Sequence, residues 1–86
     1  MGVLFQQQKT TDLDNTRSMI EIQERIQETI EHLRSNPKDG SALKLLGALY
    51  KEAGLYKEAV SAYVSASREL PGDREIQRAF IDLRAR

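Results

Sequence analysis

Apolar and polar residues recur at helical spacing along most of the chain, and the first such segment is the longest. Its apolar positions fall every third or fourth residue and lie on one face: Met19, Ile22, Ile26, Ile30 and Leu33. Its acidic positions fall on roughly the opposite face: Glu21, Glu24, Glu28 and Glu31. This separation predicts an amphipathic helix. Ser18 and Glu21 have the spacing of a capping box, so the helix is expected to begin near Ser18, or one turn earlier at Asp14 or Asn15.

Turn-forming residues separate this helix from a second one. The dipeptide Asn36-Pro37 disfavours helix, because proline restricts the residue before it. Asp39 or Ser41 can cap the second helix, which is expected to end just before Gly54. Gly54 can adopt a positive φ at that end, with Leu55 as the apolar contact that accompanies such a turn.

Two shorter helices complete the pattern. One is expected from about Tyr56 to Glu69, and Pro71-Gly72 ends it. Asp73 can cap the other, whose apolar stripe consists of Ile76, Ala79, Phe80 and Leu83. No segment alternates with the period of a strand. The chain is therefore expected to be all-α, with about four helices arranged as antiparallel hairpins.

The residues before the first helix differ from the rest. Residues 6–15 are polar except for Leu13, so residues 1–14 are expected to form a flexible N-terminal arm. Residues 15–86 are expected to form one helical domain. A chain this short buries only about 60–65% of its unfolded surface, which leaves a thin margin of stability.

Composition and charge narrow the functional classes. Lysine plus arginine and aspartate plus glutamate both number 13, so the net charge is zero with the histidine neutral. Nucleic-acid and membrane-surface binding normally need a basic excess, so neither partner is expected. No apolar run approaches the roughly 18 residues of a membrane span. Without cysteine the chain has no disulfide or thiolate metal site, which favours a reducing, cytoplasmic compartment.

Candidates for catalysis or metal binding are few. His32 is the only histidine, and it lies near the acidic face at the end of the first helix, where the helix dipole favours an exposed histidine. The stretch DLDNT at residues 12–16 begins like a calcium loop, but Gln23 stands where the closing glutamate belongs. No phosphate-binding loop occurs. We therefore expect no catalytic residue, no cofactor and no metal.

An internal repeat is visible in the spacing of Pro37 and Pro71, which equals the spacing of Asp39 and Asp73. We call this spacing the repeat period. It has the length of a tetratricopeptide repeat, a helix–turn–helix unit of about 34 residues. The positions that match the pattern of that unit are Leu43, Leu46, Gly47, Tyr50, Gly54, Tyr56, Ala59, Tyr63, Ala66 and Pro71. On these residues the chain resembles the tetratricopeptide repeat family over about residues 37–73. The resemblance implies a right-handed superhelical array with one full repeat, about residues 40–73, and a C-terminal capping helix at 73–85.

The flanking helices follow the repeat less closely. One repeat period before Tyr63 stands Thr29, and one repeat period after Gly47 stands Ile81. Within the full repeat, Gly47 and Ala59 are expected to let the two helices approach within about 8–10 Å, with the three tyrosines filling the space around the crossing. A mid-helix glycine costs about 1 kcal/mol relative to alanine, and this close approach supplies the reason for Gly47.

The family resemblance implies a function in binding another protein. In tetratricopeptide proteins the first helix of each hairpin lines a concave groove for a peptide or helix, which here implies Ser41, Lys44, Ala48, Lys51 and Glu52. Such a module would be an adaptor or assembly chaperone. The variant that grips the C-terminal carboxylate of heat-shock chaperones has Asn four residues after its lysine. Lys44 matches that lysine but Ala48 replaces the Asn, so this clamp is not expected.

A structural role is the alternative. Stacked repeats usually need three or more units, because each hairpin leaves apolar surface for a neighbour. The Met19–Leu33 stripe must be buried either on Leu45 and Leu49 of its own chain or against another copy. In the second case the protein would be a homo-oligomer with the long helices at its interface.

Overall fold

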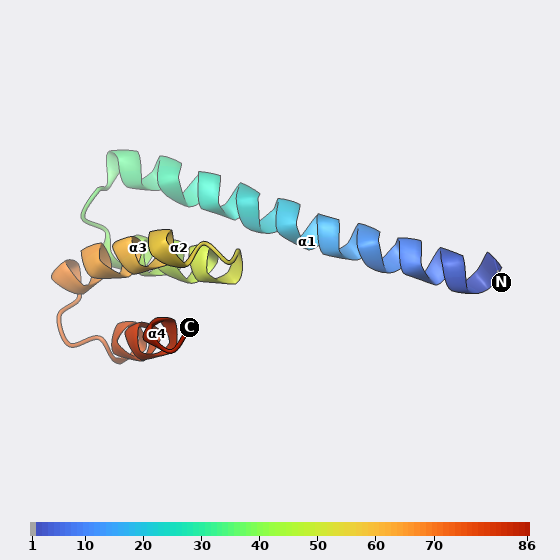
Figure 1. Ribbon diagram of the computed structural model, residues 1–86. Helices are drawn as coiled ribbons and strands as arrows, with labels where there is room; N and C mark the ends of the chain where they lie inside the picture. Colours follow the sequence, from blue (N-terminus) through green and yellow to red (C-terminus); the bar gives the residue numbers. More distant parts are fainter. Residues whose placement is uncertain (1) are drawn as a thin grey trace.

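The computed structural model describes the backbone of residues 2–86 and the side chains of residues 18–86. Over residues 2–86 the chain forms no strand and four helices: α1 (Gly2–Ser35), α2 (Gly40–Glu52), α3 (Tyr56–Glu69) and α4 (Arg74–Arg84). Consecutive helices run antiparallel, with the α2–α3 hairpin between α1 and α4 (Figure 1). The expected all-α fold of helical hairpins is confirmed.

Helix α1 begins earlier than the capping-box pattern predicted. It starts at Gly2 rather than near Ser18. No proline or glycine interrupts the chain between Gly2 and Pro37, so the S-x-x-E pattern at Ser18 lies inside a continuing helix. The flexible arm predicted at residues 1–14 lies outside the residues whose side chains are described, and its flexibility stays a prediction.

The predicted helix caps are confirmed. The Asp39 carboxylate accepts a hydrogen bond from the Ala42 backbone N–H (3.1 Å), and Asp73 accepts one from Ile76 (3.0 Å). Gly54 has a φ of 80°. Next to it, the Leu55 N–H donates to the Tyr50 carbonyl at 2.8 Å, which closes the C-terminus of α2.

Two apolar cores flank the hairpin. The α1-side core consists of Ile26, Leu46, Leu49 and Ala62, so α1 packs on both α2 and α3. The α4-side core consists of Ala59, Tyr63, Ala66, Ile76, Ala79 and Leu83. Tyr50 packs against both cores. The hairpin therefore contributes one face to each flanking helix.

Gly47 lies where α2 meets the Tyr63 side chain of α3, which fits the expectation that a tyrosine fills the space at this glycine. A Cβ at this position would stand 2.8–2.9 Å from three atoms of the Tyr63 ring. The ring is buried, and its other neighbours include Phe80, with ring centroids 6.2 Å apart in an edge arrangement. Gly47 thus makes room for the face of Tyr63, while Ala59 is fully buried in the α4-side core.

The chain repeats one backbone arrangement at the repeat period. Helices α1 and α3 end at Ser35 and Glu69, and helices α2 and α4 begin at Gly40 and Arg74. Three backbone hydrogen bonds recur in the two turns that join these helices. In the first turn they run from Asn36 N to His32 O, from Asp39 N to Asn36 O and from Leu43 N to Asp39 O. In the second turn the equivalent bonds run from Leu70 N to Ala66 O, from Asp73 N to Leu70 O and from Gln77 N to Asp73 O. We call residues 22–52 the first unit and residues 56–86 the second unit.

Candidate functional site: the groove between α2 and α4

An open groove of about 500 Å³ lies between α2 and α4, and Tyr63 of α3 forms part of its base. Helix α2 lines it with Ser41, Lys44, Leu45, Ala48 and Lys51. Helix α4 lines it with Glu75, Arg78, Ala79 and Asp82. A second hollow of about 450 Å³ shares Ala48, Lys51 and Tyr63, and it adds Glu52, Tyr56 and Arg86. We treat the two hollows as one groove.

All five residues that the family resemblance placed in a binding groove line these two hollows. Ser41 and Lys44 lie in the first hollow, Glu52 lies in the second, and Ala48 and Lys51 lie in both. They share one face of α2 because they recur at positions one turn apart. The contributions of α3 and α4 were not anticipated from the sequence.

Both groove lysines form ion pairs with α4. Lys44 Nζ lies 3.0 Å from Asp73 Oδ2 and 3.6 Å from Glu75 Oε2. Lys51 Nζ lies 2.6 Å from Asp82 Oδ2. The Lys44 and Asp73 side chains are only 25% and 20% exposed, so solvent screens this pair less than a surface pair. The lysines therefore fasten α4 to α2, and their charge is largely neutralised within the chain.

The ion pairs also shift the ionisation of their members. The hydrogen bond from Lys44 lowers the pKa of Asp73, with a further contribution from the Ile76 N–H. The same contact raises the pKa of Lys44. The hydrogen bond from Lys51 lowers the pKa of Asp82. Each of these three shifts favours the charged form of its group, so Asp73, Lys44 and Asp82 are ionised at neutral pH.

Tyr56 lines the groove instead of filling the helix crossing, so that part of the packing prediction was wrong. It is the first residue of α3, directly after the turn that joins α2 to α3, and it is 40% exposed. The Arg86 guanidinium lies 5.1 Å from its ring centroid, and Arg86 Nη1 donates to the Tyr56 hydroxyl at 3.4 Å. Arg86 also pairs with Asp82 at 3.3 Å, which continues the polar wall of α4.

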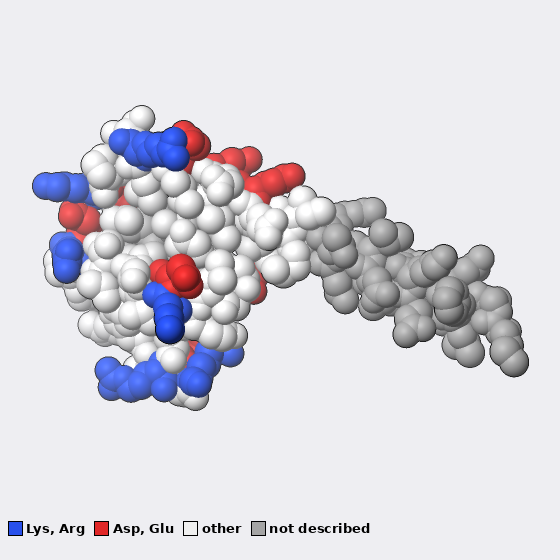
Figure 2. Space-filling model, turned by 45° about the horizontal axis from the view of Figure 1, so that its top comes forward, with Lys and Arg blue, Asp and Glu red and all other residues white. Residues whose placement is uncertain are grey.

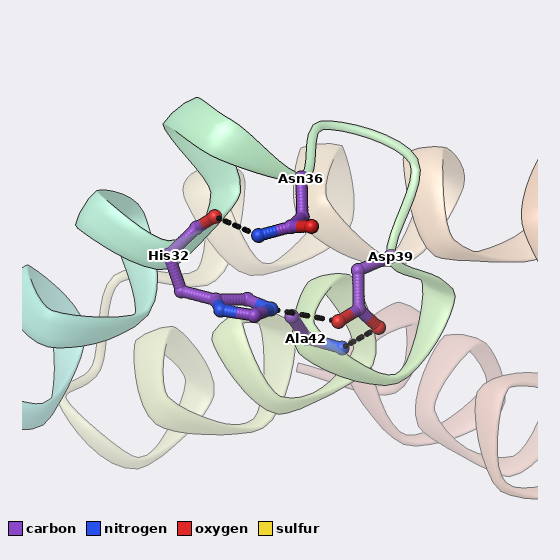
Figure 3. Close-up of polar contacts among 4 residues, drawn as sticks. All are labelled: His32, Asn36, Asp39 and Ala42. Carbon is purple, nitrogen blue, oxygen red and sulfur yellow. Dashed lines mark hydrogen bonds and ion pairs between the residues drawn. The ribbon is translucent and has the colours of Figure 1, made fainter.

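His32 ties the end of α1 to the start of α2 (Figure 3). Its Nε2 lies 2.7 Å from Asp39 Oδ2, while Asp39 Oδ1 accepts the capping bond from Ala42. Asn36 Nδ2 donates to the His32 carbonyl at 3.2 Å. The contact with His32 is the main cause that lowers the pKa of Asp39. The histidine is exposed at the helix end as expected, but its pairing with the cap of the next helix was not foreseen.

The apolar stripe of α1 packs mainly against other residues of the same chain. Ile26 is buried in the α1-side core, and Ile22, Ile30 and Leu33 pack around that core. Met19 is 43% exposed. Leu49 takes part in this packing as one of the two expected partners, whereas Leu45 is 50% exposed. Self-association through the Met19–Leu33 stripe stays a prediction.

The described surface carries both basic and acidic side chains. Basic and acidic side chains are interspersed over the face in Figure 2. Among the described residues, no three His, Asp or Glu side chains are grouped to hold a metal ion. None of the helices in the described part of the chain combines the length and hydropathy needed to cross a bilayer.

Comparison with known proteins gave no match. Neither family models, nor curated proteins, nor solved structures match this chain significantly.

Proposed function

We propose that the chain is a protein-interaction module of the tetratricopeptide type, an adaptor or assembly chaperone that binds a peptide or short helix of another protein in the groove between α2 and α4. The observation that carries this proposal is the meeting of all five expected groove residues, from Ser41 to Glu52, in two adjoining hollows. The backbone turns that recur at the repeat period support the same assignment.

The side chains of the groove suit a ligand that presents an apolar residue. Leu45, Ala48 and Ala79 lie between polar walls, and Leu45 is half exposed. Small-molecule and peptide sites typically combine such an apolar floor with a few polar groups that fix orientation. Lys44 and Lys51 are already paired with carboxylates, so an acidic ligand would have to compete with α4 for them. We therefore favour a ligand that is not strongly acidic.

The experiment places a bulky side chain on the floor of the groove. Ala48 is exposed near the middle of α2, so Ala48→Arg fills the groove without disturbing either core. Ser61→Arg, on the exposed surface of α3, is the matched control. Substitutions at Lys44 or Lys51 would not test ligand binding alone, because they also break the ion pairs to α4.

Peptides would be selected from a random displayed library on the wild-type chain, and their affinities measured by calorimetry. We expect Ala48→Arg to weaken their binding by at least about tenfold, which corresponds to about 1.4 kcal/mol, and Ser61→Arg to leave it unchanged. Failure to select any peptide, or equal binding to both variants, would contradict the proposal.

Self-association through the Met19–Leu33 stripe is the second candidate. It has less support, because Ile22, Ile26 and Ile30 already pack against α2 and α3 of their own chain.

A further inference from the structure

The two units share a backbone arrangement, but the inner face of the first is covered only in part: Thr29 is 8% exposed, whereas His32 and Leu45 are exposed. In the second unit, Tyr63, Ala66, Ile76 and Ala79 are buried in a core to which α2 contributes Leu43 and Tyr50. The equivalent residues of the first unit, one repeat period earlier, are Thr29, His32, Ala42 and Leu45. These four residues line an open hollow of about 340 Å³ between α1 and α2, together with Glu28 and Ser41.

The hollow marks the place that a helix equivalent to α2 would occupy. Leu45 shows the difference directly, since it is 50% exposed while its equivalent, Ala79, is 6% exposed. No helix of the described residues lies over the hollow. A helix that filled it would cover the first unit as α2 covers the second.

We propose that α4 of a second copy of this chain docks in the hollow, so that copies associate head to tail. Helix α4 begins one repeat period after α2 and therefore presents its side chains in the register of α2. Its outward residue Ile81 is equivalent to Gly47 and is 70% exposed. It is the most exposed of the large hydrophobic side chains described.

The sizes of the facing residues are complementary. Within one chain, Gly47 faces the large ring of Tyr63. Between copies, the equivalent pair is Ile81 against the small Thr29. In the first pair the small residue is on α2 and the large one on α3, whereas in the second pair the large residue is on α4 and the small one on α1. The total side-chain volume of the two pairs is therefore similar, as close packing requires.

The charges are complementary as well. Within one chain, Lys44 of α2 binds Asp73, the cap of α4, at 3.0 Å. The equivalent pair between copies is Arg78 of α4 and Asp39, the cap of α2. Arg78 takes part in none of the ion pairs found among residues 18–86. Asp39 already contacts His32, but a carboxylate has about four acceptor sites and can take a further donor.

Such a contact is heterologous, because it joins two different surfaces. Every open assembly keeps one free hollow at one end and one free α4 at the other, so growth continues unless the copies close into a ring. The contact would involve one short helix and one hollow of about 340 Å³, so we expect weak association that depends strongly on concentration. The contact shares Ser41, Leu45 and Arg78 with the peptide groove, but Ile81 and Ala42 do not line that groove, so changes at these two positions test the association separately from peptide binding.

The test blocks the two surfaces one at a time. Ile81→Glu places a charge on the exposed face of α4. Ala42→Glu fills the hollow and keeps α2 intact, because glutamate three residues after an Asp cap favours a helix start. Circular dichroism would verify that both variants keep the wild-type helix content. Sedimentation velocity would be recorded from low micromolar to millimolar concentrations.

We expect the wild-type average mass to rise with concentration and each variant alone to remain a monomer. An equimolar mixture of the two variants should form a complex of two chains and no larger one, because only one intact pair of surfaces remains. Arg78→Glu should weaken wild-type association by about fivefold at low salt, whereas Arg68→Glu on the exposed surface of α3 should not. A monomeric wild type, single variants that associate like the wild type, or a mixture that does not pair would overturn the proposal.

Discussion

The first and second units have the same turn but different neighbours. In both units the turn contains a proline, an aspartate caps the next helix, and the same backbone hydrogen bonds form. The other carboxylate oxygen of the aspartate contacts a different side chain in each unit. Asp73 binds Lys44, which comes from the preceding helix hairpin, while Asp39 binds His32, which lies at the end of the helix just before it.

This difference shows which features of the fold depend on the local sequence and which depend on the packing of neighbouring helices. The local sequence Pro-x-Asp is enough to set the turn, whether or not another helix covers it. Which side chains become buried depends on the neighbour, because Ala79 is buried under α2 while its equivalent Leu45 is half exposed. Pairs of equivalent positions therefore provide matched mutations for separating the two effects.

The largest expected effect is at Gly47 and its equivalent Ile81. Gly47→Val should lower the free energy of unfolding by about 3 kcal/mol, because the new side chain would overlap the buried Tyr63 ring. Ile81→Val should change it by less than about 0.5 kcal/mol, since Ile81 is 70% exposed. Urea unfolding at a concentration where the chain is monomeric would measure both. Equal stability of the two variants would show that α2 and α3 do not meet as closely as described.

A smaller effect is expected at Gly40 and its equivalent Arg74, the first residues of α2 and α4. A Cβ at Gly40 would lie 2.6 Å from Leu70 Cγ, whereas Arg74 is exposed. Gly40→Ala should therefore destabilise the chain by about 1 kcal/mol, although alanine favours helix. Arg74→Ala should be close to neutral, and thermal melts of the two variants would measure both effects. A gain in stability from Gly40→Ala would mean that Leu70 moves aside without loss.

Removing only the charge of each capping aspartate should lower the melting temperature by different amounts. Asparagine can still cap a helix, so Asp73→Asn and Asp39→Asn isolate the ion pairs from the caps. Asp73→Asn should lower the melting temperature more, by a few degrees, because it leaves the partly buried Lys44 with only Glu75 at 3.6 Å. Asp39→Asn loses only an exposed contact with His32. The reverse order would show that the His32 contact is the stronger one.

The smallest expected effect is a difference in pH dependence. The pKa values of Asp39 and Asp73 are lowered, so their contributions are complete above the ordinary value of 3.8 and are lost as pH falls through the lower folded-state pKa. The pKa of Lys44 is raised, so its contribution is complete below 10.5 and is lost as pH rises through the higher folded-state pKa. Asp73→Asn should flatten both the acid and the alkaline decline of stability.

Asp39→Asn should flatten only the acid decline, because Asp39 is not a partner of Lys44. Urea midpoints measured from acid to alkaline pH would compare the two variants with the wild type. An alkaline decline that Asp73→Asn leaves unaltered would show that Lys44 does not depend on Asp73.

Much of the fold could be predicted because the helices and turns are determined by residues close together in the sequence. The helix periodicity, the caps at Asp39 and Asp73 and the positive φ at Gly54 all depend on neighbouring residues. The start of α1 was misplaced because a capping motif such as that at Ser18 can also occur inside a helix. The residues that α2 contributes to the groove were expected from the family resemblance.

The other face of the groove required knowing what lies opposite α2. The pairs Lys44–Asp73 and Lys51–Asp82 join residues that lie far apart in the chain, at separations that no periodic pattern marks. The same limitation hid the contact between Tyr56 and Arg86, which depends on where α4 ends relative to α3.

Tyr50 links the two apolar cores, so we expect the helices to unfold cooperatively. Its side chain packs against both the α1-side and the α4-side core, so opening either one removes contacts from the same ring. Arrays whose repeats meet only at separate interfaces can fray from an end while the remainder stays folded. Here we expect the flanking helices to melt in a single cooperative transition with the hairpin, and their amide protons to exchange with similar protection.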